Sequence, residues 1–337
     1  MQIVENQSLK NYHTFHLPVK ARYWVHYETE DELCALLQMP LLKENKYMPI
    51  GSGSNLLFTR DYAGVLLHSG IQSIAVCKET DDAVWLRVGS GVVWDELCQY
   101  AVDHGWYGIE NLSYIPGEVG ASAVQNIGAY GVEVAEVIDR VEAIAIATGE
   151  KSIFSVSDCA YGYRTSRFKT DWKGQYIITA VVYRLRKLPI FHLSYGHLQA
   201  RFGENETITL EGVRREIIAV RQSKLPDPEL YGNAGSFFVN PVISEAHFQQ
   251  LVKDYPAMPH YRLSEEVVKV PAAWLIEQCG WKGVARGGAA VHDKQCLVLI
   301  NKCNATAADI VDLAAAVCQS VSERFGITIT PEVNYID

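Results

Sequence analysis

The residues 115–131 constrain the fold more than any other part of this chain. They read Ile-Pro-Gly-Glu-Val-Gly-Ala-Ser-Ala-Val-Gln-Asn-Ile-Gly-Ala-Tyr-Gly and mix glycines with small and amide side chains. Glycine lets the backbone approach a ligand closely and adopt a positive φ, at an entropic cost that an ordinary core segment has no reason to carry. We therefore predict a loop whose backbone N–H groups face an anion.

A second glycine-rich segment, Gly-Ser-Gly-Ser-Asn-Leu-Leu-Phe at 51–58, follows a strand-like run at 47–50. It departs from the Rossmann fingerprint, because Leu56 stands where the third glycine belongs and no convincing helix follows. We interpret it as a phosphate-cradling loop between strands. Either segment alone could be a structural turn, but two in one region favour a nucleotide cofactor.

The composition excludes several function classes. The chain has 337 residues, is 48% hydrophobic and carries a formal net charge of −9 without a Lys/Arg block, which argues against nucleic acid or an anionic membrane as the main partner. The eight cysteines form no C-x-x-C pair and no zinc spacing, so we expect free thiols and no metal. No signal peptide or apolar run of membrane-spanning length is visible, and we expect a cytoplasmic protein.

Local patterns predict short strands mixed with helices. Thr29 is a typical N-cap with Glu32 at the capping-box position, and Thr306 forms the same box with Asp309 in a helix that ends at Gly326. The predicted helices are 30–38, 93–104, 212–223, 271–279 and the one after 306, and the predicted strands are 21–27, 83–88, 141–146, 176–183 and a pair within 289–300.

Three positions could carry chemistry, and each also has a structural interpretation. Arg164 lies among the cations of 161–169, which form either a solvated strand edge or an anion site that a guanidinium fork suits. Ser236, within 232–241, is either a turn hydroxyl or a reactive group, although the absence of a Gly-x-Ser-x-Gly elbow argues against acyl transfer. Glu332 is either solvent-facing or fixed on a strand-like run near the C-terminus.

These motifs resemble those of the UDP-N-acetylenolpyruvoylglucosamine reductases, and the resemblance runs through nearly the whole chain. Besides the two glycine-rich segments, it rests on Gly-Tyr-Arg-x-Ser-x-Phe-Lys, Asn-x-Gly-Ser-x-Phe-x-Asn-Pro and the C-terminal Pro-Glu-Val. The resemblance implies an α+β fold: an FAD-binding domain of the vanillyl-alcohol-oxidase type and a smaller α+β substrate-binding domain. We expect the first at 1–214, with two subdomains split near 70, the second at 215–327, and a strand at 328–337 that returns to the first.

The resemblance also implies a mechanism. NADPH would reduce FAD, and flavin N5 would then deliver hydride to C3 of UDP-N-acetylglucosamine enolpyruvate, giving UDP-N-acetylmuramate for peptidoglycan synthesis. Arg164 and Glu332 would stabilise the developing negative charge, Glu332 as a protonated donor. Ser236 would protonate C2.

Further contacts follow from the same motifs. The residues expected to bind FAD are Ile50, Gly51, Ser52, Gly53, Ser54, Asn55, Leu56, Ile115, Pro116, Gly117, Gly120, Ala121, Ser122, Gln125, Asn126, Gly128, Ala129, Tyr130 and Gly131. The residues expected to bind substrate are Tyr163, Arg164, Tyr195, Lys224, Asn240 and Gln295, with Tyr195 in a Tyr-Gly-x-Leu loop that would close over it.

Three positions depart from the family pattern: His13 replaces an Asn, Ala123 a proline and Val239 a lysine. The first two affect fine details of the cofactor contacts and the third a substrate contact. Two alternatives stay open, a flavin oxidase on the same fold and a non-catalytic sensor of a nucleotide sugar or flavin. In every case we expect small-molecule partners and a monomer.

Overall fold

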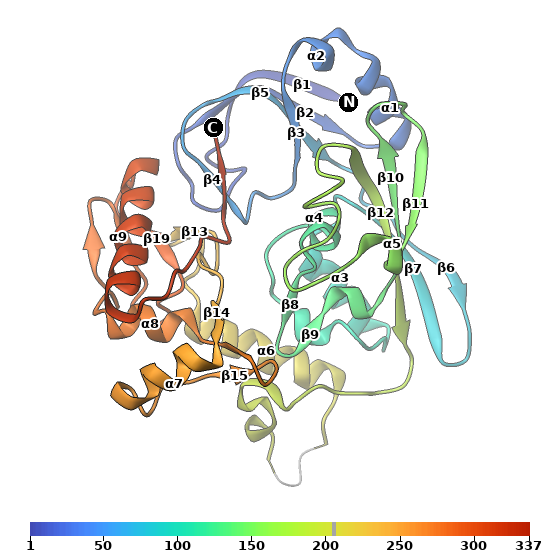
Figure 1. Ribbon diagram of the computed structural model, residues 1–337. Coiled ribbons are helices and arrows are strands. Elements are labelled where there is room, and N and C mark those ends of the chain that lie inside the picture. The colour runs from blue at the N-terminus through green and yellow to red at the C-terminus, as the bar shows by residue number, and fades with distance from the viewer. Residues whose placement is uncertain (204–206) are drawn as a thin grey trace. The chain divides into compact units, whose positions relative to one another are not determined.

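The computed structural model describes residues 1–203 and 207–337, and these residues form two compact units (Figure 1). Unit 1 comprises 1–7, 21–52 and 63–221, and unit 2 comprises 8–20, 53–62 and 222–337. The division falls inside helix α6 (Leu210–Lys224), later than the expected limit at 214. The short segments 8–20 and 53–62 also belong to unit 2, which no local sequence pattern indicates.

The first layer of unit 1 is a four-stranded sheet with the order β1-β2-β5-β3. Its strands are β1 (Gln2–Ser8), β2 (Lys20–Tyr27), β3 (Tyr47–Ile50) and β5 (Tyr62–Ser69). Helices α1 (Glu30–Gln38) and α2 (Pro40–Glu44) cover it with apolar side chains such as Leu33 and Leu36, both fully buried. Strand β3 runs parallel to β5 at the edge of this sheet, so the loop after β3 begins at the carboxyl end of an edge strand.

The second layer of unit 1 is a five-stranded sheet with the order β11-β10-β12-β7-β6 and antiparallel neighbours. Its strands are β6 (Ile74–Glu79), β7 (Ala83–Gly89), β10 (Ile138–Ala145), β11 (Lys151–Ser155) and β12 (Tyr176–Arg186). Because β12 is central, its residues 177–183 are buried on both faces. Helices α3 (Trp94–Asp103) and α4 (Val119–Gln125) pack onto this core, and α5 (Val156–Cys159) follows β11.

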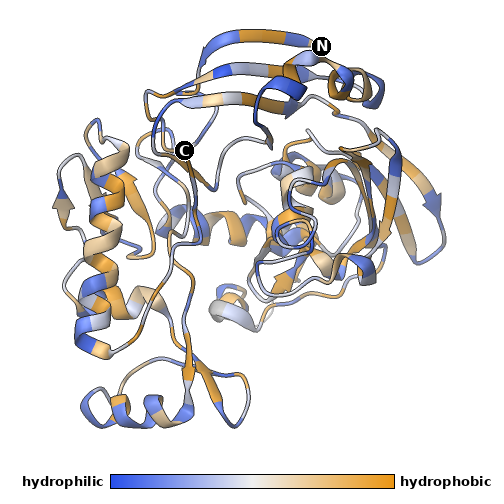
Figure 2. Ribbon diagram, turned by 45° about the horizontal axis from the view of Figure 1, so that its top comes forward, coloured by the Kyte–Doolittle hydropathy of each residue, from blue (hydrophilic) through white to orange (hydrophobic). Residues whose placement is uncertain are grey.

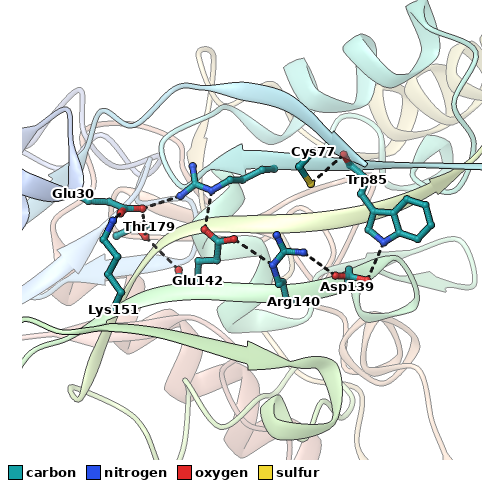
Figure 3. A network of polar contacts seen from close by, with 9 residues as sticks. Glu30, Cys77, Trp85, Asp139, Arg140, Glu142, Lys151 and Thr179 are labelled. Atoms are coloured by element: carbon teal, nitrogen blue, oxygen red, sulfur yellow. Dashed lines mark hydrogen bonds and ion pairs between the residues drawn. The ribbon is translucent and has the colours of Figure 1, made fainter. Parts of the chain in front are cut away.

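A ladder of alternating charges joins the two layers of unit 1 (Figure 3). Arg87 of β7 donates to Glu142 at 2.7 Å and to Glu30 of α1 at 2.8 Å. Glu30 also contacts Lys151 Nζ at 2.5 Å and accepts from the Thr179 hydroxyl at 3.1 Å. Helix α1 is therefore tied by hydrogen bonds to three strands of the second sheet.

The rest of unit 1 consists of short elements. They are the 3-10 turns η1 (Glu110–Leu112), η2 (Val134–Glu136) and η3 (Tyr195–Arg201), and the hairpin of β8 (Gly128–Ala129) with β9 (Val132–Glu133). Helix α6 completes the unit, with Val213 and Ile217 packed against Leu193 and Leu198.

Among the described residues, unit 2 has three helices, a two-stranded sheet and two larger sheets. The larger sheets are β13 (Gly232–Asn233), β19 (Leu299–Asn301), β18 (Ala289–Val291) and β17 (Ala285–Arg286), and separately β14 (Val242–Ser244), β16 (Val267–Lys269) and β15 (Tyr261–Arg262). The helices are α7 (Glu245–Asp254), α8 (Ala272–Gln278) and α9 (Ala307–Phe325). Helix α9 is amphipathic, with polar and apolar patches along it (Figure 2), and its buried apolar residues include Ile310, Leu313, Val317 and Val321.

Strand β20 (Asn334–Ile336) pairs in parallel with β4 (Leu56–Phe58), and both lie in unit 2. We expected the strand at 328–337 to return to the first domain. Its partner β4 lies within the residues that we expected to form the first domain, but β4 itself packs with unit 2. Among the described residues no helix is both long and apolar enough to cross a membrane, and all eight cysteines are free thiols.

Candidate active site

The loop that follows Ile50 connects strands β3 and β4 without an intervening helix, as its sequence predicts. Gly53 has φ +64, and a Cβ at this position would lie 2.5 Å from the carbonyl oxygen of Tyr12, so only glycine fits. Next to it, Ser52 Oγ is buried and has no hydrogen-bond partner among the described residues. A buried hydroxyl in this state indicates a position that a ligand can satisfy.

The long glycine-rich segment is not the continuous loop that we predicted, because its residues 119–125 form helix α4. Val119, Ser122 and Ala123 form the buried face of that helix. Small side chains allow this face to approach the sheet, and Ser122 Oγ lies 3.0 Å from the Tyr183 hydroxyl. The helix ends at Asn126, which has φ +48 and is the C-cap.

The side chain of Asn126 forms hydrogen bonds within the protein. Its Nδ2 donates to Glu133 at 2.8 Å and to the Gly162 carbonyl at 2.9 Å, and its Oδ1 accepts from the Ala135 N–H at 3.1 Å. The side chain of Ser122 is similarly engaged, with Val119 and Tyr183. We expect these two residues to shape the cofactor site through the backbone rather than through their side chains.

Arg164 lies in a tight turn and has φ +56, a conformation that costs a residue with a side chain about 1–3 kcal/mol. Its Nη2 donates to the Gly128 carbonyl at 2.5 Å and its Nη1 to the Asn126 carbonyl at 3.5 Å. The structure thus brings together the predicted anion-binding arginine and the end of the long glycine-rich segment, both within unit 1. Such strain is typical of functional positions, where the surrounding fold maintains it.

Ser236 and Glu332 belong to segments that lie side by side in unit 2. The N–H of Glu332 donates to the carbonyl of Phe237 at 2.8 Å, and Val239 donates to Thr330 at 3.0 Å. Ser236 is exposed, while the following Phe237 is fully buried and anchors the serine segment. The structure therefore brings these two predicted catalytic segments together, although they are far apart in sequence.

The first glycine-rich loop contacts the segment of Glu332 in unit 2. Asn55 Nδ2 donates to the carbonyl of Glu332 at 3.3 Å, and the N–H of Asn334 donates to the carbonyl of Asn55 at 3.1 Å. Because β4 and β20 continue this contact, Glu332 is held between the serine segment and a predicted cofactor loop.

The predicted substrate residues are divided between the units. Arg164, Tyr163 and Tyr195 lie in unit 1. The two tyrosines are about half exposed, and the Tyr195 ring packs edge-on against Tyr130 with centroids 6.4 Å apart. The other three lie in unit 2: Lys224 is exposed at the end of α6, Asn240 Oδ1 accepts from the Ala272 N–H at 2.9 Å, and Gln295 Oε1 accepts from the Leu297 N–H at 3.2 Å.

Arg221 is a residue that the sequence reasoning missed. It lies in α6, its Nε donates to the Tyr114 carbonyl at 3.0 Å, and burial lowers the pKa of its guanidinium, although the nearby Tyr130 and Asp95 oppose this shift. Arg164 is also close enough for its charge to lower the pKa of Arg221. Its position three residues before Lys224 was the available signal, since that spacing places both on one side of a helix.

Comparisons with known proteins converge on one family. A family model described as the C-terminal domain of UDP-N-acetylenolpyruvoylglucosamine reductase matches residues 227–336, and one described as an FAD binding domain matches residues 21–153. The UDP-N-acetylenolpyruvoylglucosamine reductase of Bacteroides fragilis is 49% identical over 98% of this chain and 99% of its own. That of Porphyromonas gingivalis is 46% identical, with both chains covered completely (100%). The crystal structure of the Thermus caldophilus reductase covers 100% of this chain and 98% of its own with a TM-score of 0.70 at 22% identity, which shows a shared fold.

Proposed function

The chain belongs to the UDP-N-acetylenolpyruvoylglucosamine reductases, and we propose how its own residues divide the work of that reaction. It is an FAD-binding oxidoreductase of peptidoglycan precursor synthesis, so the predicted family, the α+β fold and the enzyme class are confirmed. The finer proposal is that it reduces UDP-N-acetylglucosamine enolpyruvate to UDP-N-acetylmuramate with NADPH, in the cytoplasm and as a monomer.

Two features of the first glycine-rich loop fit a bound FAD. Ser52 offers a buried hydroxyl without a protein partner among the described residues, and Gly53 supplies the positive φ that anion-cradling loops use. We therefore propose that 50–56 and 115–131 hold the cofactor. Bound FAD would take hydride from NADPH and pass it to the enolpyruvyl double bond, chemistry that no side chain supplies.

We propose that Arg164 binds the carboxylate of the substrate. A guanidinium matches a carboxylate with two parallel hydrogen bonds, and it stays charged when the carboxylate gains negative charge during the reaction. The contacts of Arg164 with Gly128 and Asn126 support the proposal, because they fix the side chain before substrate arrives. Arg221 would add a second positive charge nearby.

We propose that Ser236 donates the proton to C2 and that Glu332 helps to stabilise the developing charge. A hydroxyl is a weak acid, so it must be positioned closely against the carbon that it protonates. The observation that carries this assignment is the hydrogen bond between Glu332 and Phe237, which supports a rigid link between the two segments.

The test separates the two half-reactions. Ser236→Ala should let NADPH bleach the flavin at the normal rate under anaerobic conditions, but reoxidation by the enolpyruvyl substrate should slow by about 10²–10³-fold, the usual cost of losing one donor to a transition state. Ser264→Ala, at another exposed serine of unit 2, is the matched control and should react normally. Unimpaired reoxidation in Ser236→Ala would disprove the proton-donor role.

A further inference from the structure

Two histidines and a glutamate form a hydrogen-bonded chain inside unit 1. His26 of β2 and His68 of β5 have their Nδ1 atoms 2.9 Å apart, and His68 Nε2 lies 3.2 Å from Glu118 Oε1. The indole of Trp24 stacks on His68 with centroids 5.1 Å apart and an interplanar angle of 25°. Strand pairing and this stacking hold the His68 ring in one orientation, with its Nε2 directed at Glu118.

The chain of hydrogen bonds has a definite direction. An ionised carboxylate only accepts hydrogen bonds, so His68 donates from Nε2 to Glu118. The Nδ1 of a neutral His68 must then accept, and His26 therefore donates from its own Nδ1. Burial, and then the neighbouring His68, lowers the pKa of His26, which favours the neutral form of His26. Two protonated Nδ1 atoms at 2.9 Å would place two hydrogens between the rings, so one of the two Nδ1 atoms carries no hydrogen.

Glu118 joins the two glycine-rich segments. It belongs to the segment 115–131, where it is the N-cap of α4, and it is only 8% exposed. Its Oε2 lies 3.0 Å from the point that a Cβ at Gly51 would occupy, so the carboxylate packs directly against the backbone of the first loop. A Cβ at position 51 would force this carboxylate to shift by a few tenths of an ångström.

We propose that His68, oriented by His26, positions the Glu118 carboxylate against Gly51 and thereby fixes the backbone of the first glycine-rich loop for FAD. His68 is thus a positioning residue, and the inference rests on the proposed cofactor site. The loop residue next to Gly51 is Ser52, whose buried hydroxyl is the group that we expect the cofactor to satisfy. Movement of Glu118 would therefore displace a residue that contacts FAD.

The experiment combines a tautomer measurement with FAD titrations. In ¹⁵N-histidine spectra of the cofactor-free protein, the Nε2 of His68 should carry a hydrogen, which it donates to Glu118. In fluorescence titrations, His68→Phe, which keeps a stacking ring without an N–H, should weaken FAD binding about tenfold to a hundredfold, as the loss of an outer hydrogen-bond partner does at metal sites. His68→Gln, whose amide can reach the position of Nε2, should restore most of that loss.

The matched control is His104→Phe, because His104 also stacks on a tryptophan in unit 1 but is exposed. It should bind FAD like the unmodified protein. A His68 whose Nε2 carries no hydrogen, or a His68→Phe variant with unchanged FAD affinity, would overturn the inference and leave the proposed function intact. An unmodified protein that binds no FAD would overturn both.

Discussion

Replacing Arg214 tests why helix α6 belongs to unit 1. Its Nη1 and Nη2 donate to the two carboxylate oxygens of Asp95 on α3 at 2.7 and 2.9 Å, and its Nε donates to Gln99 at 2.9 Å. The Arg214 side chain is 9% exposed and that of Asp95 29%. Burial would raise the pKa of Asp95, but hydrogen bonds from Arg214 and the Tyr114 N–H outweigh it and hold the pKa below its usual value.

Arg214→Met keeps the buried aliphatic part of the side chain and removes the charge. Breaking a buried pair costs about 3–5 kcal/mol when the remaining charge is left without a partner. Asp95 is partly exposed and keeps its hydrogen bond from Tyr114, so we expect roughly half, about 2 kcal/mol. Native-state hydrogen exchange of the α6 amides measures this free energy of opening directly.

The effect should depend on pH in a defined direction. Asp95 has a lowered pKa in the folded state, so its contribution is complete above the ordinary aspartate pKa near 4 and disappears as pH falls through the lowered value. Arg215→Met is the matched control, because this neighbouring side chain is 67% exposed, and it should change exchange by less than about 0.5 kcal/mol. Equal effects of the two variants, or an Arg214→Met effect that does not shrink as the pH is lowered, would refute the reasoning.

Three other perturbations have clear expected outcomes. Gly53→Ala should lower the melting temperature by several degrees and abolish FAD binding in a fluorescence titration, because its Cβ would collide with Tyr12; near-normal values in both measurements would contradict this. Glu110→Gln should stabilise the protein at pH 7 but not at pH 4 in thermal melts, since burial raises the pKa of Glu110 and its ionisation costs stability as pH rises; a loss at pH 7 would show that the charge is needed. Glu30→Gln should lower urea stability by about 1–3 kcal/mol at pH 7 and less at pH 3, because hydrogen bonds from Lys151 and Thr179 outweigh its burial and lower its pKa; a pH-independent loss would exclude this explanation.

Sequence patterns that involve only neighbouring residues predicted the starts of two helices correctly. Thr29 accepts from the Glu32 N–H and α1 spans the predicted 30–38, and the capping box of Thr306 with Asp309 starts α9 as expected. These signals act within one helical turn, so neighbouring residues determine them. The loop between β3 and β4 was also predicted from residues that are neighbours in the sequence.

Features that depend on tertiary packing were missed. Helix α4 was missed because Gly120 and Ser122 are typical of loops. Close packing of this helix against the sheet favours small side chains at such positions. The hydrogen bonds that link His26, His68 and Glu118 could not be predicted from the sequence, for a different reason. Each residue is ordinary in its own segment, and only strand pairing places them within hydrogen-bonding distance. For the candidate site, the sequence indicated candidate residues. Their hydrogen-bond partners became visible only in the folded structure.

The pairing of β20 with β4 has a consequence for the order of folding. The bond between Asn55 and Glu332 closes a loop of 277 positions, and most of the intervening chain, 63–221, belongs to unit 1. Closing so long a flexible loop is entropically costly, and contacts of this separation form slowly. If unit 1 folds first, much of that loop is already compact, and the closure becomes easier. We expect the segment that carries Glu332 to be among the last to gain protection in pulse-labelled refolding, so that the site is completed only when folding is nearly finished.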